Sequence, residues 1–385
     1  MQQLALDTQS FEDLRNNNCV YVDKTEIIHK VITGGRIYFL SRPRRFGKSL
    51  LISTLEAIFK GKKNLFEGLY IYDKWDWEQQ YPVIKIDWAG INHSTLEKME
   101  ESLIFHLTRI ARNYHIALTA KNASDCFVEL IESLQKKEGK KVVILIDEYD
   151  KPVTAHIADS SLLEKFKTDV HNFYQVMKSS DEYLKFVFVT GVSKFSGLSI
   201  FSALNNPRDI TLREQYATIC GYTQEELESN FPEYINRAAE HLKITRDDLL
   251  EQIRYWYNGY TWDGETAIYN PFSTMNFFED RKFDNYWFNS GTPTFLIDLI
   301  RRRNSMDSVL RPIVVDSSVF KEYDPVNISE IPLLFQTGYL TIKEMELTPD
   351  GVAEYTLDIP NMEVNKSLMT HLLKACGKYS DDREF

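Results

Sequence analysis

The chain has 385 residues, of which 43% are hydrophobic and 26% charged, a balance typical of globular proteins and unlike that of disordered chains. Its formal net charge of -11 excludes nucleic-acid binding through overall charge, although local basic patches stay open. The four cysteines are far apart, which argues against a zinc site or a disulfide framework. No secretory signal or membrane-spanning run is found, so a cytoplasmic location is expected.

Four short apolar runs in the first half of the chain have the pattern of strands buried on both faces. Amphipathic stretches such as residues 49–59 lie between them, and strands that alternate with helices form parallel sheets. The sequence therefore predicts an α/β fold with helices flanking a parallel sheet, and a ligand site outside the carboxyl ends of its strands. The predicted strands are residues 36–41, 82–87, 141–147 and 184–191.

Residues 41–51, SRPRRFGKSLL, follow the first predicted strand and open a predicted helix, as a phosphate-binding loop does. In such a loop Gly47 lets the backbone approach a phosphate, Lys48 reaches the β- and γ-phosphate oxygens, and the Ser49 hydroxyl holds Mg²⁺. The full pattern is GxxxxGK[ST], and its first glycine falls on Arg42. The loop predicts ATP as ligand, with the nucleotide-binding residues Arg44, Arg45, Phe46, Gly47, Lys48, Ser49 and Leu50.

Two features of this loop leave alternatives open. Gly-Lys-Ser alone also occurs by chance in solvated basic turns, and Pro43 lacks the N–H that a phosphate cradle uses. The side chains of Arg44 and Arg45 either add positive charge toward the phosphates or are simply solvated. The strand–loop–helix context and the acidic motif described next favour the phosphate loop.

Asp147 and Glu148 stand at the end of the third predicted strand, where a buried acid needs a cation or a donor. We expect Asp147 to bind Mg²⁺, directly or through water, and Glu148 to polarise the attacking water. The alternative is that both acids cap the following segment. Thr190, at the end of the next strand, either orients that water and senses the γ-phosphate or only ends its strand. The following side chains are open between site and structure: Asp87 at another strand end, and Lys194, Arg208 and Arg213 as transition-state cations or surface charges.

From residue 221 the pattern changes to helices. Thr223 to Glu226 forms a capping box, Thr245 starts another helix, and the dipeptides Asn270-Pro271 and Thr292-Pro293 open two more. A helix over 331–337 precedes two strands, 339–346 and 353–359, with a turn at Pro349-Asp350-Gly351, and a last helix covers 364–376. Helix followed by hairpin indicates a winged-helix-like part. The predicted domains are a P-loop ATPase domain (1–220), a helical lid (221–310), and a winged-helix-like segment with the C-terminal helix (311–385).

Two further clusters bear on partners. The basic run 301–303 suits either DNA contact or a helix C-terminus. The aromatic residues Tyr255, Trp256, Tyr257, Tyr260 and Trp262 either stack a base or form the lid core. The apolar helix 331–337 is expected to be core and not a groove-reading helix.

Ten ordered segments resemble the AAA-ATPase-like proteins of bacteria, a branch of the AAA+ and STAND-type P-loop ATPases. The resemblance runs from about residue 5 to 364 and includes the arginine in place of the first P-loop glycine. The segments are YVDKT (21–25), LSRPRRFGKSL (40–50), IDEYDKP (146–152), VTGVSKFS (189–196), FSALNNPRDIT (201–211), CGYTQEE (220–226), WYNGY (256–260), YNPFS (269–273), YWFNSGTP (286–293) and LFQTGYL (334–340).

The resemblance implies an ATPase domain followed by a helical lid, with Lys48, Ser49, Asp147 and Glu148 at the phosphate, magnesium and catalytic positions. It places residues 21–25 near the base. In many relatives a PD-(D/E)XK nuclease domain follows the point where this chain ends, and none is expected within these residues.

Three functions are compatible with these observations. The first is an ATPase that acts as a switch or motor for a partner, such as a nuclease in cis or in trans. The second is a non-hydrolysing nucleotide sensor, and the third is a phosphotransferase. Self-association and nucleic-acid binding stay open.

Overall fold

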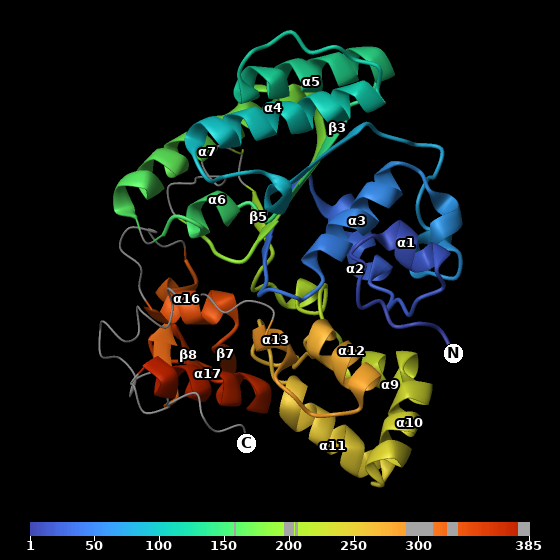
Figure 1. The fold of residues 1–385 in the computed structure, drawn as a ribbon, viewed down its shortest axis with the longest axis vertical. Coiled ribbons are helices and arrows are strands. Elements are labelled where there is room, and N and C mark those ends of the chain that lie inside the picture. Colours follow the sequence, from blue (N-terminus) through green and yellow to red (C-terminus); the bar gives the residue numbers. More distant parts are fainter. Residues whose placement is uncertain (158, 196–203, 205–206, 290–310, 322–329, 376–385) are drawn as a thin grey trace.

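The computed structural model describes residues 1–157, 159–195, 204, 207–289, 311–321 and 330–375 (Figure 1). Within these residues the larger sheet is parallel and has the strand order β2-β3-β4-β1-β5. Its strands are β1 (Ile37–Ser41), β2 (Val83–Asp87), β3 (Val142–Asp147), β4 (Leu184–Gly191) and β5 (Arg208–Asp209). The first four confirm the sequence prediction. β5 was not predicted, because a strand of 2 residues carries no periodicity.

The strand order dictates which face each helix covers. The chain crosses the sheet from β1 to the edge strand β2 and then returns through β3 to β4. Because each crossover is right-handed, the helix of the outward connection and the helices of the return connections lie on opposite faces of the sheet. Accordingly α1 (Phe11–Asn16), α2 (Thr25–Gly34) and α3 (Lys48–Phe59) lie on one side. The other side carries α4 (Leu96–Asn113), α5 (Ala123–Glu138), α6 (Lys151–Thr154) and α7 (Ser160–Ser179) (Figure 1).

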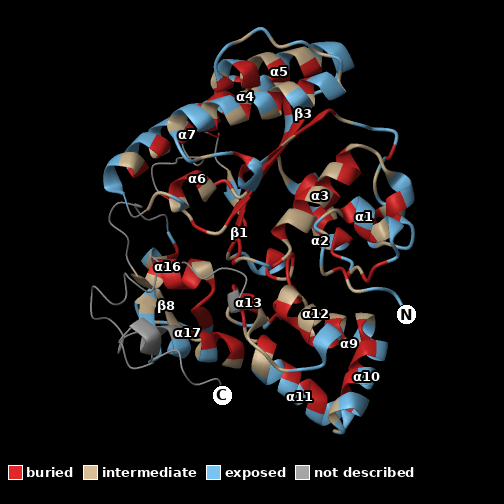
Figure 2. Ribbon diagram, viewed as in Figure 1, coloured by how far each residue is buried: buried red, intermediate tan, exposed pale blue. Residues whose placement is uncertain are grey.

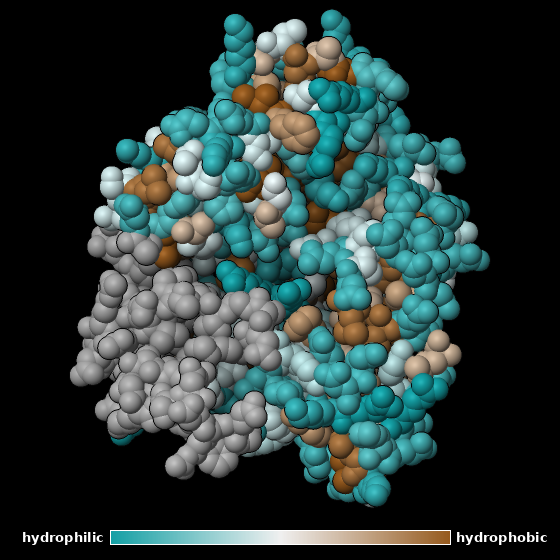
Figure 3. All heavy atoms as spheres, in the orientation of Figure 1, coloured by the Kyte–Doolittle hydropathy of each residue, from teal (hydrophilic) through white to brown (hydrophobic). Residues whose placement is uncertain are grey.

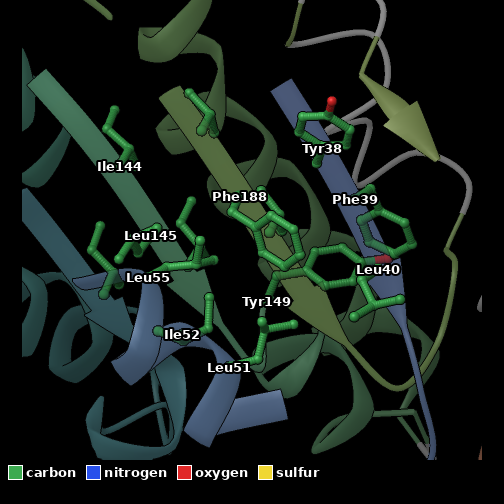
Figure 4. Packing of buried hydrophobic residues seen from close by; sticks show 14 of the residues in the cluster. Tyr38, Phe39, Leu40, Leu51, Ile52, Leu55, Ile144, Leu145, Tyr149 and Phe188 are labelled. Carbon is green, nitrogen blue, oxygen red and sulfur yellow. The ribbon is translucent and has the colours of Figure 1, made fainter. Parts of the chain in front are cut away.

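The sheet is the centre of the main core. All residues of β1 and β3 are buried, which explains their continuous apolar sequences (Figure 2). Leu51, Ile52 and Leu55 of α3 pack on this sheet beside Leu145 and Phe188 (Figure 4). Because this packing fixes α3 on the sheet, the N-terminus of α3 lies at the carboxyl end of β1.

A second core lies in the helices after residue 221. The predicted capping box at Thr223 is present, and Thr245 and Asn270 cap their helices as predicted. Val20 and Val22 from the N-terminal segment belong to this helical core, together with residues such as Leu227 and Phe277. The helices are α9 (Gln224–Asn230), α10 (Pro232–Leu242), α11 (Arg246–Tyr257), α12 (Pro271–Asp280) and α13 (Tyr286–Asn289).

The C-terminal part confirms the predicted helix and hairpin. Helix α16 (Glu330–Thr337) is followed by antiparallel β7 (Thr341–Leu347) and β8 (Ala353–Asp358), and β6 (Ile313–Asp316) pairs with the other edge of β8. α16 buries Leu333, Leu334 and Phe335, as expected for core. The last helix, α17 (Met362–Ala375), begins two residues before its predicted start at 364.

The buried residues of this part join the main core, whereas Val20 and Val22 join the helical one. The proposed division at residues 220 and 310 therefore stays a prediction.

The helix start at Thr292-Pro293 and the basic run 301–303 lie outside the described residues. Short 3₁₀ helices cover Lys63–Phe66, Tyr70–Asp73, Trp88–Gly90, Asp181–Tyr183, Glu214–Tyr216 and Ser317–Phe320. Within the described chain, none of the helices has the length and apolar character needed to cross a membrane.

Candidate nucleotide site

The loop between β1 and α3 has the backbone shape that an anion site needs. Gly47 is the N-cap of α3 and has φ of 89°, in the left-handed region, and Arg45 has φ of 68°. A Cβ built on Gly47 would meet no atom within 4 Å, so space is open in front of the loop. The first N–H groups of α3 have no partner within the helix and carry its positive dipole end. These features suit an anion, and phosphate binding at this loop stays a prediction.

Lys48 is held by its own loop. Its Nζ donates to the carbonyl oxygens of Arg42 and Pro43, each at 3.0 Å, and the residue is 6% exposed. Burial lowers the pKa of Lys48, while the carboxylates of Asp147 and Glu148 act in the opposite direction. A phosphate oxygen would give this ammonium a stronger acceptor than the two neutral carbonyls.

The acids predicted at the end of β3 lie near the phosphate loop, because only β4 separates β3 from β1 in the sheet. Asp147 is 3% exposed, and its Oδ1 accepts from the Thr190 hydroxyl at 2.6 Å and from the Glu148 N–H at 3.0 Å. The Thr190 hydroxyl thus contacts Asp147, which supports a role in positioning that carboxylate. Glu148 has φ of 50°, which is uncommon for residues other than glycine.

The turn after Glu148 is tied to the loop after β4. Asp150 is buried and accepts the N–H of Ser193 at 2.8 Å, and the Tyr149 hydroxyl donates to the Ser193 carbonyl at 2.7 Å. A Cβ at Gly191 would come within 2.6 Å of Asp150 Oδ1, so only glycine permits this approach. Tyr149 and Asp150 therefore hold the turn in place.

A cavity of about 360 Å³ opens at the phosphate loop, within the size range of small-molecule sites. The lining includes residues 44–51, Glu148 and Lys151. It also includes Phe272 and Met275 of α12 and residues of the N-terminal segment. Hydrophobic side chains gather on the surface where α2 faces α12 (Figure 3). Tyr21, Val22 and Lys24 are among the lining residues, and the placement of residues 21–25 near a base stays a prediction.

A second cavity, of about 400 Å³, is lined by Ser49, Asp147 and Asp87. Asp87 is the register partner of Asp147 and accepts the N–H of Ala89 at 2.9 Å, which gives it a local structural role. Within the described residues, no three His, Cys, Asp or Glu side chains gather to hold a metal. Ser49 and Asp147 fit Mg²⁺ only if phosphate and water oxygens complete its shell.

The remaining predicted residues are placed as follows. Phe46 is buried under Tyr260 and Trp262, with ring centroids 4.8 and 5.3 Å away, and Leu50 lines the cavity. Arg45 is exposed, and its guanidinium lies 4.6 Å from the Phe272 ring centroid of α12, so a role toward the phosphates stays a prediction. Arg44 lines the cavity, and its carbonyl accepts from the Trp287 indole at 3.2 Å.

The three candidate transition-state cations make structural contacts. Lys194 forms an ion pair with Asp209, and Arg208 donates to the Gly34 carbonyl. Arg213 Nε donates to the Asp209 carbonyl at 3.0 Å. In the part of the chain that the structure describes, all three lie outside the cavity lining, which favours their structural interpretation.

Sequence reasoning missed the role of Arg42 and of the aromatic pair after α11. Arg42 is fully buried, and its Cζ lies 4.0 Å from the Trp262 ring centroid. Tyr260 and Trp262 belong to the main core and contact the phosphate loop, whereas Tyr257 and Trp256 pack in the helical core. Tyr255 is 61% exposed. The one signal in the sequence was the arginine at the position of the first P-loop glycine.

A parallel sheet with a glycine–lysine–serine loop at one strand end and a paired acid at a neighbouring strand end defines a P-loop nucleotide-binding protein. The family model described as Predicted AAA-ATPase matches residues 5–201, and the chain belongs to this family. Membership supports nucleotide binding and ATPase activity in general.

One relative is 38% identical over 373 residues, covering 97% of this chain and 70% of its own length. It is described as an uncharacterized protein in the vnfD 5′ region of Azotobacter chroococcum mcd 1. Among solved structures, the Aeropyrum pernix ORC2 protein in ADPNP–ADP complexes aligns with 96% of this chain and 95% of its own. The identity is 11% and the TM-score 0.34, too low for any argument.

Proposed function

We propose that the protein binds ATP with Mg²⁺ and hydrolyses it, and that hydrolysis drives a switch or motor for a partner or linked effector. The observation that carries the proposal is the convergence of Lys48 and Glu148 on one cavity, with Asp147 and Ser49 lining the adjoining one. Nucleotide phosphates at the N-terminus of α3 would stand between these two groups of residues.

Each residue has a distinct role in this proposal. Lys48 exchanges its two loop carbonyls for phosphate oxygens and offsets their charge. Glu148 lines the cavity and holds the attacking water as a hydrogen-bond acceptor. Thr190 keeps the Asp147 carboxylate oriented toward the metal position. Mg²⁺, when bound by Ser49 and Asp147, supplies charge neutralisation of the phosphates.

The test is steady-state phosphate release with ATP and Mg²⁺, with ATP binding measured in parallel. Glu148→Gln should bind ATP but lose turnover by about 100-fold or more, since it removes the general base. Lys48→Ala should lose binding. Lys30→Ala and Glu26→Gln, an exposed pair on α2, are the matched controls and should behave as wild type.

The alternatives give different results in the same assay. ATP binding without turnover in the wild type would favour the nucleotide sensor. Phosphate release that requires an added acceptor would favour a phosphotransferase. Unchanged turnover in Glu148→Gln would remove the proposed catalytic role. The partner's identity, a nuclease effector included, and self-association are proposals that co-purification and sedimentation would test.

A further inference from the structure

The phosphate loop is held from outside by residues far along the chain. The Trp287 indole Nε1 donates to the Arg44 carbonyl at 3.2 Å, across 243 positions of sequence. Trp287 is 6% exposed, so this hydrogen bond is shielded from water. A shielded hydrogen bond to the backbone restricts the loop at Arg44, which lines the cavity.

A second anchor grips the loop two residues earlier. The Arg42 guanidinium is 4.0 Å from the Trp262 ring centroid and donates to the Thr211 carbonyl at 2.8 Å. Burial lowers the pKa of Arg42 to about 10, so it stays charged at neutral pH. The attraction between a cation and an indole face is stronger when the cation is shielded from water than when it is exposed. Gly338 packs against Pro43, between the two anchors.

These anchors act on the residues that hold the phosphate-binding lysine. Lys48 Nζ donates to the carbonyls of Arg42 and Pro43, so the position of the ammonium depends on the loop segment that Trp262 and Trp287 fix. Trp287 also contacts the C-terminal helix α17, because its backbone N–H donates to Glu363 Oε1 at 2.8 Å. Glu363 in turn accepts from the Ser273 hydroxyl at 2.8 Å.

We propose that Trp262 and Trp287 are positioning residues that lock the phosphate loop to the C-terminal half of the chain, so that nucleotide binding and the packing of α17 are coupled. The proposal rests on the proposed nucleotide site and deepens it by naming its regulation. Such coupling is reciprocal. A change that displaces α17 or the segment before it weakens nucleotide binding, and bound nucleotide opposes that displacement by the same factor.

The experiment compares backbone hydrogen exchange of the full chain in wild type, Trp287→Phe and Trp262→Leu, first without nucleotide. Phe keeps a ring but no donor, and Leu removes the aromatic face. The matched controls are Trp77→Phe and Trp77→Leu. Trp77 is buried against Phe66, and its indole Nε1 donates to the Tyr72 carbonyl at 2.8 Å, but it lies outside the lining of the cavity. Should one test variant fail to fold by circular dichroism, the other decides.

We expect residues 42–50 to exchange about tenfold faster in both test variants and to be unchanged in both controls, since one hydrogen bond or cation–π contact is lost. ATP affinity should fall about tenfold in the same variants. Wild-type exchange at residues 42–50 in a folded test variant would overturn the proposal. Absence of ATP binding in the wild type would defeat the nucleotide site instead, while the exchange comparison would still decide whether the tryptophans hold the loop.

Discussion

The hydroxyl of Thr190 donates a 2.6 Å hydrogen bond to the carboxylate of Asp147, across 43 positions of sequence. Both residues are buried, and both stand at carboxyl ends of adjacent strands. Water reaches this bond poorly, so neither residue can replace its partner with solvent. The bond fixes the direction of the proposed magnesium ligand before any metal binds.

Thr190→Val, which keeps the shape and removes the hydroxyl, should therefore cost about 1–2 kcal/mol of unfolding free energy, because it leaves a buried carboxylate oxygen short of a donor. It should also raise the Mg²⁺ concentration needed for half-maximal phosphate release. Urea unfolding and a Mg²⁺ titration are the measurements. Thr190→Ser should retain both properties, and Thr33→Val, at an exposed site, is the control. An unchanged Mg²⁺ requirement in Thr190→Val would argue against the positioning role.

Gly338 should tolerate no side chain. Its φ is 92°, and a Cβ would stand 2.8 Å from Pro43 Cβ, so Gly338→Ala combines backbone strain with a clash against the phosphate loop. We expect a loss of about 2 kcal/mol or more in denaturant unfolding. Gly351→Ala shares the left-handed backbone, with φ of 78°, but meets nothing within 4 Å. Equal losses in the two variants would show that the contact with Pro43 is unimportant.

The ion pair between Lys24 and Glu226 joins the N-terminal segment to α9, with Nζ at 2.6 Å from Oε1. The two side chains are 10% and 25% exposed. Lys24→Met should cost about 3 kcal/mol, since it leaves the carboxylate poorly solvated and without its cation. Adding Glu226→Gln should recover a large part of the loss, because glutamine keeps an acceptor for the Thr223 N–H. Chemical denaturation of the single and double variants tests this. Lys30→Met, at an exposed pair, should change stability by less than about 1 kcal/mol. A double variant no more stable than Lys24→Met would contradict the explanation.

Glu363 gives stability a pH dependence. Burial raises its pKa from the ordinary 4.5 to about 7, although hydrogen bonds from Trp287 and Ser273 act in the opposite direction. Between these two values the folded protein holds a proton that the unfolded chain has released. The free energy of unfolding from this group should therefore fall as pH rises through that window, by at most about 1.4 kcal/mol per pH unit.

Glu363→Gln should remove this slope. Urea unfolding at a series of pH values between 4.5 and 7 measures it in wild type and variant. Glu240→Gln, on the exposed side of α10, should leave the slope as in wild type. If the slopes of wild type and Glu363→Gln coincide, Glu363 is ionised throughout and the assignment is wrong.

Strands β1 to β4, the loop before α3 and the paired acids after β3 could be predicted from the sequence alone. These features are local: an apolar run of five or six residues indicates a buried strand, and glycine, lysine and serine between such a strand and an amphipathic stretch indicate a loop that opens a helix. The helix caps at Thr223, Thr245 and Asn270 were predictable for the same reason, since each cap bonds to residues two or three positions away.

Tertiary structure alone decided which distant residues complete the site. β4 lies between β1 and β3, and this placement brings Thr190 to Asp147. The anchors Trp262 and Trp287 reach the loop from more than 200 positions away, and nothing in their local sequence distinguishes them from core aromatics. The burial of Arg42 could not be predicted from the sequence, because its acceptors, such as the Thr211 carbonyl, come from distant segments. Such contacts depend on chain closure over long separations, which local periodicity and propensity do not encode.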